Sequence, residues 1–294
     1  MPYSEVFAAL SISRPVRERL DAGGFDAQVV AVFDRACNLV TPDGDVVTLV
    51  IPQVGDGPLN VVVNGTPGFF AGVGHGAPLR LAGDRLQVDG LWVDLEGAAV
   101  WEPRPDWETL RARRTAIGSW LPHLRALCLR HAPTGSLLGL LTCSLPDEPP
   151  ARITLFAAQR ATEALQEGWT GDSQRLREGA AGLAGLGSGL TPAGDDFLAG
   201  AMLWAWLDHP TPEMFCRAVA RVAAPRTTTL SAALLKAAAR GECSAAWHAL
   251  ISALSMGQRE GARNKITEAV HEILSHGATS GADSLAGFLL HPTC

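Results

Sequence analysis

The segment GLGSGLTPAGDDFLAGAMLWAWL, residues 185–207, begins glycine-rich and ends strongly apolar. Its last eleven residues, 197–207, carry no charged side chain. A membrane-spanning helix needs about 20 such residues, so this run predicts a helix buried inside a folded domain. Thr191 followed by Pro192 predicts the start of that helix, with the hydroxyl as cap and the proline in the first turn.

Helical spacing of apolar residues continues on both sides of this segment. Ile266, Val270 and Ile273, for example, recur at three- and four-residue steps, as do apolar residues between 117 and 128. Residues 133–152 break the pattern with prolines and predict a short element and a loop. Helices are predicted at approximately 153–167, 173–185, 192–208, 212–223, 229–239, 244–255 and 261–275.

The first hundred residues have a different pattern. Short Val-rich runs alternate with turn sequences such as PDGD and NGTPG, which is typical of a small antiparallel barrel or sandwich. Alternating apolar residues on both sides of Asp89-Gly90 predict a hairpin. Asn38 interrupts one apolar run and is compatible with a turn or a bulge.

The chain is therefore predicted to have an α+β fold with two domains. A β-rich domain at 1–105, barrel- or sandwich-like, precedes a mostly helical domain at 106–294 that carries the functional site. This segregation of strands and helices argues against a doubly wound parallel sheet. We find no internal repeat of fixed period.

Composition and charge exclude several classes of protein. The 294 residues carry a net charge of −6, which argues against nucleic acid as a partner. No run is long enough to predict a membrane span, and the N-terminus lacks the apolar core of a signal peptide. The six cysteines lie far apart, as expected for small buried side chains in a reducing compartment. We expect a cytoplasmic protein.

The glycine-rich segment matches none of the familiar glycine motifs. The dinucleotide, Walker A and nucleophile-elbow patterns each fail at a required position, and the histidines of HEILSH (271–276) are one residue too far apart for zinc. Gly187 and Gly189 nevertheless permit a backbone that exposes N–H groups, with Ser188 between them. Such groups at a helix start form an anion cradle, and Asp195 and Asp196 lie in the first turn behind it. The alternative is a plain turn before a capped core helix.

Two more segments place hydroxyl and charged groups at predicted helix starts. RTTTLS (226–231) combines Arg226, suited to gripping a carboxylate or phosphate, with Thr228 and Ser231. In HGATSGADSLAG (276–287), Thr279, Ser280 and Asp283 fall in the first turn of a helix. Each segment alone is compatible with an ordinary helix cap. Three such starts in one domain predict convergence around a small anionic ligand.

These three motifs, in this order, resemble the AllH-type subunit of oxamate carbamoyltransferase, a bacterial family with the patterns GLGxGLTPxGDDFLxG, RTTxLS and GATSGxD. The resemblance is specific over residues 180–290 and looser in the β-rich part. It implies a multi-subunit enzyme of allantoin and purine nitrogen catabolism. That enzyme interconverts oxalurate and phosphate with oxamate and carbamoyl phosphate, so other protein subunits are expected as partners.

Carbamoyl transfer requires a grip on phosphate and on a small carboxylate, together with stabilisation of charge on a carbonyl oxygen. The candidate catalytic residues are Asp195, Asp196 and Arg226. The candidate substrate-binding residues are Gly187, Ser188, Gly189, Thr191, Thr228, Ser231, Thr279, Ser280 and Asp283. Under this hypothesis the aspartates orient the amine, act as base or hold a cation such as Mg²⁺ at Asp195 and Asp196; the sequence does not rank these roles.

Two other functions remain open from sequence. One is a metal-dependent hydrolase or transferase of another small anionic amide or phosphate compound, with Asp195, Asp196 and Asp283 as oxygen ligands. The other is a non-catalytic assembly subunit that only binds its partners.

Overall fold

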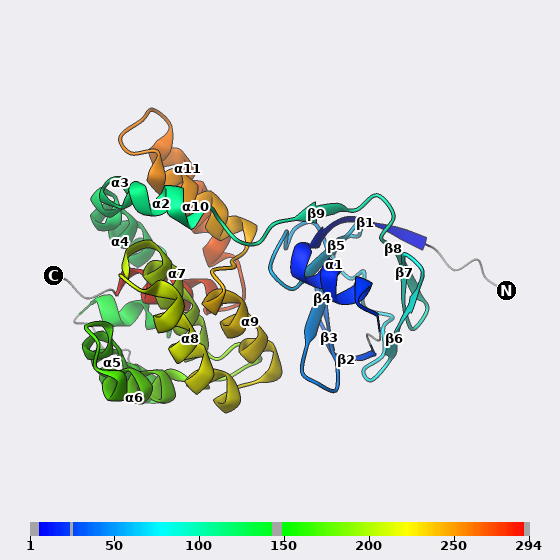
Figure 1. Ribbon diagram of the computed structural model, residues 1–294, viewed down its shortest axis with the longest axis horizontal. Helices are drawn as coiled ribbons and strands as arrows, with labels where there is room; N and C mark the ends of the chain where they lie inside the picture. Colours follow the sequence, from blue (N-terminus) through cyan, green and yellow to red (C-terminus); the bar gives the residue numbers. More distant parts are fainter. Residues whose placement is uncertain (1–5, 24–25, 143–148, 291–294) are drawn as a thin grey trace. The chain divides into compact units, whose positions relative to one another are not determined.

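The computed structural model describes residues 6–23, 26–142 and 149–290. The chain divides into two compact units, Met1–Pro103 and Arg104–Cys294 (Figure 1). The first holds the strands and the second is helical, so the predicted α+β class is confirmed.

The first unit is a closed β-barrel. Its strands follow the order β5-β4-β3-β2-β6-β7-β8-β1, and β1 pairs with β5 to close the ring, while β9 is added outside the ring on β1. The strands are β1 (Val6–Ser13), β2 (Ala27–Val32), β3 (Ala36–Val40), β4 (Val46–Val50), β5 (Asn60–Val63), β6 (Pro78–Ala82), β7 (Arg85–Val88), β8 (Leu91–Asp94) and β9 (Ala99–Trp101).

The predicted barrel is confirmed, but its pairing is mixed. The hairpin β7–β8 forms as expected, with Val88 opposite Leu91 and Asp89 at a positive φ of 54°. However, β1–β8 and β4–β5 pair in parallel. A parallel pair of strands cannot be joined by a two-residue hairpin and needs a longer connection, such as residues 51–59 between β4 and β5. The sequence did not reveal that these connections join parallel strands.

Sequence patterns missed two elements of this unit, β1 and the helix α1 (Arg14–Asp21). The helix buries Val16 and Leu20 in the barrel core. Asn38 lies within β3 as a regular strand residue, paired with Ala31. Its side chain is buried, and the hydroxyl of Thr48 on β4 satisfies its Oδ1 by donating to it at 2.9 Å. The irregularity is on β2, where one extra residue opposes this part of β3.

The second unit packs its helices around α7 (Ala193–Asp208), of which twelve of sixteen residues are buried. The predicted buried helix is therefore confirmed, with neighbours α2, α6, α8, α9 and α12. The other helices are α2 (Trp107–Ala112), α3 (Arg114–Ser119), α4 (Leu121–Arg130), η1 (Leu137–Leu141), α5 (Pro149–Trp169), α6 (Ser173–Leu183), α8 (Pro212–Ala223), η2 (Ala224–Arg226), α9 (Thr229–Ala239), α10 (Ala245–Ser255), α11 (Ala262–Leu274) and α12 (Ser280–Leu289).

The helices α7 and α12 cross at two glycines. A Cβ on Gly200 would lie 1.8 Å from the carbonyl oxygen of Ser284, and one on Gly287 would lie 1.9 Å from that of Phe197. No side chain larger than hydrogen fits at either position. The contact is reciprocal because both helices carry the pattern G-x-D-x-L-A-G, at 194–200 and 281–287.

This short repeat occurs only twice, so it does not form a pattern of fixed period along the chain. The first glycine of each copy also packs alike. A Cβ on Gly194 would meet the carbonyl of Leu183 at 2.0 Å, and one on Gly281 would meet that of Ile273 at 1.8 Å. Each helix thus lies close to the end of the helix before it, and the two aspartates of the repeat, Asp196 and Asp283, occupy equivalent positions one turn before the crossing.

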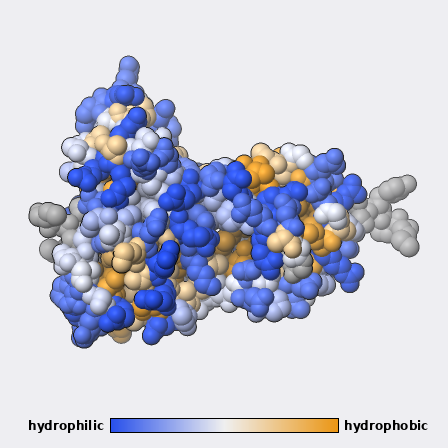
Figure 2. All heavy atoms as spheres, viewed as in Figure 1, coloured by the Kyte–Doolittle hydropathy of each residue, from blue (hydrophilic) through white to orange (hydrophobic). Residues whose placement is uncertain are grey.

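The surface of the barrel unit includes apolar side chains between polar ones (Figure 2). The large exposed ones in this unit are Val6, Leu10, Val30, Phe33, Leu81 and Val100. Four cysteines are buried and free, as expected: Cys37, Cys128, Cys216 and Cys243. Cys143 and Cys294 fall outside the described residues. No helix in the described ranges combines the length and apolar character that a membrane crossing requires.

Candidate functional site

The loop between α6 and α7, residues 184–192, has a backbone that favours glycine at three positions. Gly185, Gly187 and Gly189 have φ values of 68°, 110° and 99°, in the left-handed region. A Cβ on Gly187 would also lie 2.9 Å from the backbone nitrogen of Ala193. The φ values therefore favour glycine at all three positions, and close contacts restrict side-chain size at Gly185 and Gly187.

Free backbone N–H groups are the chemical feature of this loop. Among the described residues, the N–H groups of residues 187–191 donate no hydrogen bond, and residues 187–190 are exposed. Three of the next N–H groups, in the first turn of α7, donate to carbonyls of the loop instead. Exposed, unpaired N–H groups beside a helix N-terminus attract anions, because the helix dipole adds partial positive charge there.

The helix α7 begins one residue later than predicted. Pro192 occupies the cap position, and its carbonyl accepts the N–H groups of Asp195 and Asp196 at 2.9 and 3.2 Å. No side chain caps the helix, so the prediction that Thr191 is the cap was wrong. The hydroxyl of Thr191 faces Asp196 instead. Both aspartates do lie in the first turn.

Asp195 connects the loop to the start of α9. Its side chain is 2% exposed, Gly185 N donates to Oδ1 at 3.0 Å, and the hydroxyl of Thr227 donates to Oδ2. Burial raises the pKa of Asp195, and the hydrogen bonds that it accepts lower it. Since both oxygens are engaged, Asp195 is a structural anchor of the loop.

Thr228 and Ser231 also hold the loop in place. The hydroxyl of Thr228 accepts the N–H of Ser231 at 3.1 Å, which caps α9, and donates to the carbonyl of Leu190 at 2.6 Å. The buried hydroxyl of Ser231 lies 3.4 Å from the same carbonyl. These two predicted substrate-binding residues are thus brought to the loop and hydrogen-bonded to its backbone.

Arg226 lies beside the loop, but its side chain points elsewhere. The residue is exposed, and its guanidinium donates to the carbonyl of Val222 at 2.5 Å. Its own carbonyl is the atom that a Cβ on Gly185 would meet at 2.7 Å. The structure therefore brings the backbone of Arg226 to the site and not its charge.

The partly buried Asp196 and the fully buried Asp283 form a pair of carboxyl groups whose charges interact. In each, Oδ2 is buried without a hydrogen-bond partner, and Oδ1 of Asp283 accepts the N–H of Leu137 at 2.6 Å. Burial raises the pKa of Asp196 to about 8; the facing hydroxyl of Ser280 lowers it, and the charge of Asp283 raises it further. Burial likewise raises the pKa of Asp283 to about 7. At neutral pH the pair therefore holds at least one proton.

The start of α12 completes this cluster. Thr279 and Ser280 are half-buried, and neither side chain caps the helix. The carbonyl of Thr279 accepts the N–H of Asp283 at 2.8 Å, and its side chain lowers the pKa of that residue. The starts of α7, α9 and α12 thus converge on the two adjacent aspartates of α7; that they surround an anionic ligand stays a prediction.

Sequence reasoning missed Thr227, Gly185 and Leu137 as partners of these carboxyl groups. Thr227 belongs to a run of three threonines, and only the tertiary structure distinguishes the one that reaches Asp195. Gly185 and Leu137 contribute backbone N–H groups, which leave no sequence signal.

The described residues contain no group of three or more His, Cys, Asp or Glu side chains placed to hold a metal ion. A cation at Asp195 and Asp196 would compete with hydrogen bonds on both oxygens of Asp195. The geometry therefore fits a protonated carboxyl pair beneath the glycine loop better than it fits a metal centre.

Two family models match the chain. One, described as oxamate carbamoyltransferase subunit AllH, matches residues 183–291, and the other, the AllH family N-terminal domain, matches residues 8–100. The chain belongs to the AllH family. The C-terminal AllH model contains the glycine loop, the segment 226–231 and α12, so all the convergent helix starts lie within it. No solved structure matches the chain significantly.

Proposed function

We propose that this AllH chain is the oxamate carbamoyltransferase subunit that binds the phosphate of carbamoyl phosphate, through the N–H groups of residues 187–191. The family supplies the reaction class. The observation that carries the proposal is the exposed loop with five unpaired N–H groups at the start of a buried helix.

In the proposed reaction, the amide nitrogen of oxamate attacks the carbamoyl carbon of carbamoyl phosphate. The bond from that carbon to the phosphate oxygen breaks, phosphate leaves, and the nitrogen loses a proton to give oxalurate. Catalysis then requires that the phosphate be held while negative charge develops on it and on the carbonyl oxygen. Fixed backbone N–H groups do this without reorganisation, and the anchors at Asp195 and Thr228 keep the loop rigid.

Asp196 and Asp283 supply a proton store behind the loop in this proposal. Their free oxygens are buried, so they act on substrate through the half-buried hydroxyls of Thr191 and Ser280 that face Asp196. One of these hydroxyls takes the proton from the attacking nitrogen and passes its own proton to the ionised carboxylate of Asp196. Asp195 is a positioning residue, because both of its oxygens are engaged.

Arg226 is proposed to grip the carboxylate of oxamate. It is exposed at the edge of the loop and makes one hydrogen bond, to a carbonyl. A bidentate pair with a carboxylate is stronger than a bond to a neutral carbonyl, so bound substrate draws the guanidinium away from Val222.

Family membership also supports the wider setting. We place the reaction in allantoin nitrogen catabolism in the cytoplasm, with further subunits of the enzyme as partners. The exposed apolar side chains of the barrel unit support such contacts (Figure 2).

A glycine pair tests the anion loop. Gly189 and Gly171 both have φ near 100° and open space around a Cβ, with φ of 99° and 112°. Replacing either by Ala imposes the same backbone strain, about 1–2 kcal/mol. Titration calorimetry with phosphate and carbamoyl phosphate should show weaker binding for Gly189→Ala and parent-like binding for Gly171→Ala. Absence of binding by the folded parent chain, or equal losses in both variants, contradicts the proposal.

The internal hydrogen bonds of Asp195, Thr228 and Ser231 favour one alternative, an assembly subunit whose loop is only structural. Asp196→Asn in the reconstituted enzyme separates the two functions. The variant has no carboxylate at this position to accept the proton, so we expect turnover to fall by about 10²-fold or more with assembly intact. Unchanged turnover supports the assembly role.

A further inference from the structure

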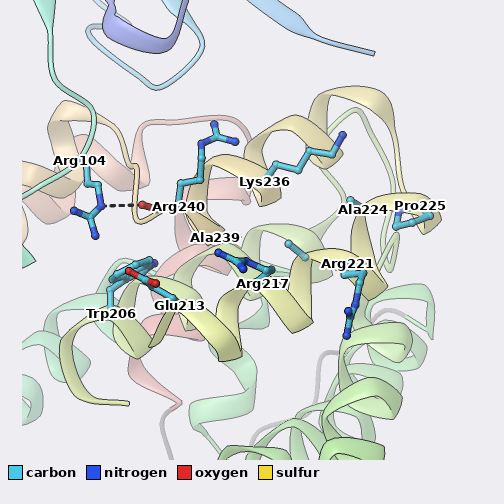
Figure 3. A pocket seen from close by; sticks show the side chains of 11 residues that line it. Arg104, Trp206, Glu213, Arg217, Arg221, Ala224, Pro225, Lys236, Ala239 and Arg240 are labelled. Atoms are coloured by element: carbon cyan, nitrogen blue, oxygen red, sulfur yellow. Dashed lines mark hydrogen bonds between the residues drawn. The ribbon is translucent and has the colours of Figure 1, made fainter. Parts of the chain in front are cut away.

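A basic pocket lies between α8 and α9, on residues that the proposed reaction does not use. Its volume is about 850 Å³. Five of its eleven lining residues are cationic and one, Glu213, is acidic (Figure 3). We propose that this pocket is a second ligand site, which takes an organic phosphate of nucleotide size bearing at least two phosphate groups.

Three of the cations have no counter-ion. Arg217 and Arg221 on α8 and Lys236 on α9 are exposed, and among the described residues they form no ion pair. Like charges that share a pocket repel one another, and the single acidic lining residue, Glu213, is outnumbered by five cations. The chain as a whole has a net charge of −6, so this concentration of positive charge is local. A ligand with several negative charges removes the repulsion.

The opposite end of the pocket is built more rigidly. Arg240 pairs with Glu242 through two bonds of 2.7 and 2.8 Å, and its carbonyl accepts Arg104 Nε at 3.0 Å. The guanidinium of Arg104 lies 4.9 Å from the ring centroid of Trp206. These residues fix the wall, and their charges are partly used within the protein.

The volume of the pocket indicates a ligand larger than orthophosphate. A volume of about 850 Å³ falls in the range of pockets for cofactors and drug-sized ligands, roughly 300–1,000 Å³. Five of the lining residues are apolar, among them Ala220, Ala239 and Trp206, and these suit an organic body rather than a second ion. The cations then hold its phosphates.

The pocket is distinct from the carboxyl pair but adjacent to it in the chain. Ala224 and Pro225 line the pocket in η2, and Thr227, the donor to Asp195, follows two residues later. None of the loop or carboxyl residues of the candidate site lines the pocket.

Calorimetric titration of the full chain with ADP tests the site, with orthophosphate and adenosine as the separate halves of the ligand. We expect saturable ADP binding that is at least tenfold weaker in Arg217→Ala/Lys236→Ala. The matched control is Arg259→Ala/Lys265→Ala, which removes an exposed Arg and Lys of the same unit away from the pocket. Absence of saturable ADP binding, equal losses in both variants, or orthophosphate as tight as ADP overturns the proposal.

Lysine labelling gives an independent measurement, because Lys236 and Lys265 are the only lysines in the sequence. Pyridoxal phosphate carries a phosphate and an aldehyde that borohydride fixes to a nearby amine. We expect Lys236 to be modified at least tenfold faster than Lys265 and to be protected by ADP, as read by peptide mass spectrometry. Equal rates at the two lysines, or no protection, count against the site.

Discussion

Replacing Asp283 by Asn should stabilise the protein at alkaline pH. In the folded chain Asp283 is fully buried, one oxygen accepts the N–H of Leu137, and the other has no partner. Burial raises its pKa to about 7, whereas the carboxyl group of an unfolded chain titrates near 3.9. Asn keeps an acceptor for Leu137 and carries no charge, so it matches the protonated form of the aspartic acid.

The sign and size of the effect follow from proton linkage. Between pH 4 and pH 7 the folded parent retains a proton that the unfolded chain has released, so the stability of the parent falls as pH rises. The slope is about 1.4 kcal/mol per pH unit, which gives about 3 kcal/mol between pH 5 and pH 7 and little further change above. The stability of the variant does not fall in this way, because Asn releases no proton. The variant also removes the negative charge beside Asp196, which stabilises it further.

Urea unfolding at pH 5 and pH 8, followed by tryptophan fluorescence, measures the difference; six of the eight tryptophans lie in the helical unit. We expect the stability of Asp283→Asn relative to the parent to increase by about 3 kcal/mol between pH 5 and pH 8. The exposed Glu268→Gln on α11 is the control and should remain parallel to the parent. A stability difference that is the same at both pH values would refute the reasoning.

Two further substitutions test the packing around the site. Gly287→Ala places a Cβ 1.9 Å from a carbonyl of α7 and should lower the free energy of unfolding in urea by about 3 kcal/mol. Gly118→Ala is the control, because its Cβ meets open space and should not lower stability. Equal effects of the two substitutions would contradict the helix crossing. Thr227→Val leaves an oxygen of Asp195 unpaired and should cost about 1–3 kcal/mol, while the exposed Thr229→Val should be nearly neutral; equal stabilities of the two Val variants would show that the hydroxyl does not hold Asp195.

The helical unit was largely predictable because its signal is local. The run 197–207 is apolar on all sides, which requires burial wherever the helix packs, and α7 is the central helix. The barrel was less predictable from the sequence. β1 pairs with β5, β8 and β9, and such long-range pairing leaves no trace in its own sequence. Asn38 looked like an interruption because its partner Thr48 lies on another strand.

For the site, the sequence identified the residues that gather but not what each one does. Asp195 and Asp196 are neighbours with the same side chain, yet hydrogen bonds occupy one and leave an oxygen of the other unpaired. Arg226 was expected for its charge, and the structure shows in addition that its carbonyl packs against Gly185. Such differences depend on the direction of each side chain, which cannot be inferred from the spacing of residues in a motif.

The reciprocal glycine crossing of α7 and α12 also sets when the carboxyl pair can form during synthesis. Asp283 follows Asp196 by 87 residues, and the helices between them must be made before α12 can dock. Until then the apolar surface of α7 lacks one of its neighbours, and a nascent chain with that surface open is a target for chaperones and for aggregation. The loop and α7 are therefore synthesised before the helix that completes their packing, and a chain truncated before residue 280 contains the loop and Asp196 but lacks Asp283.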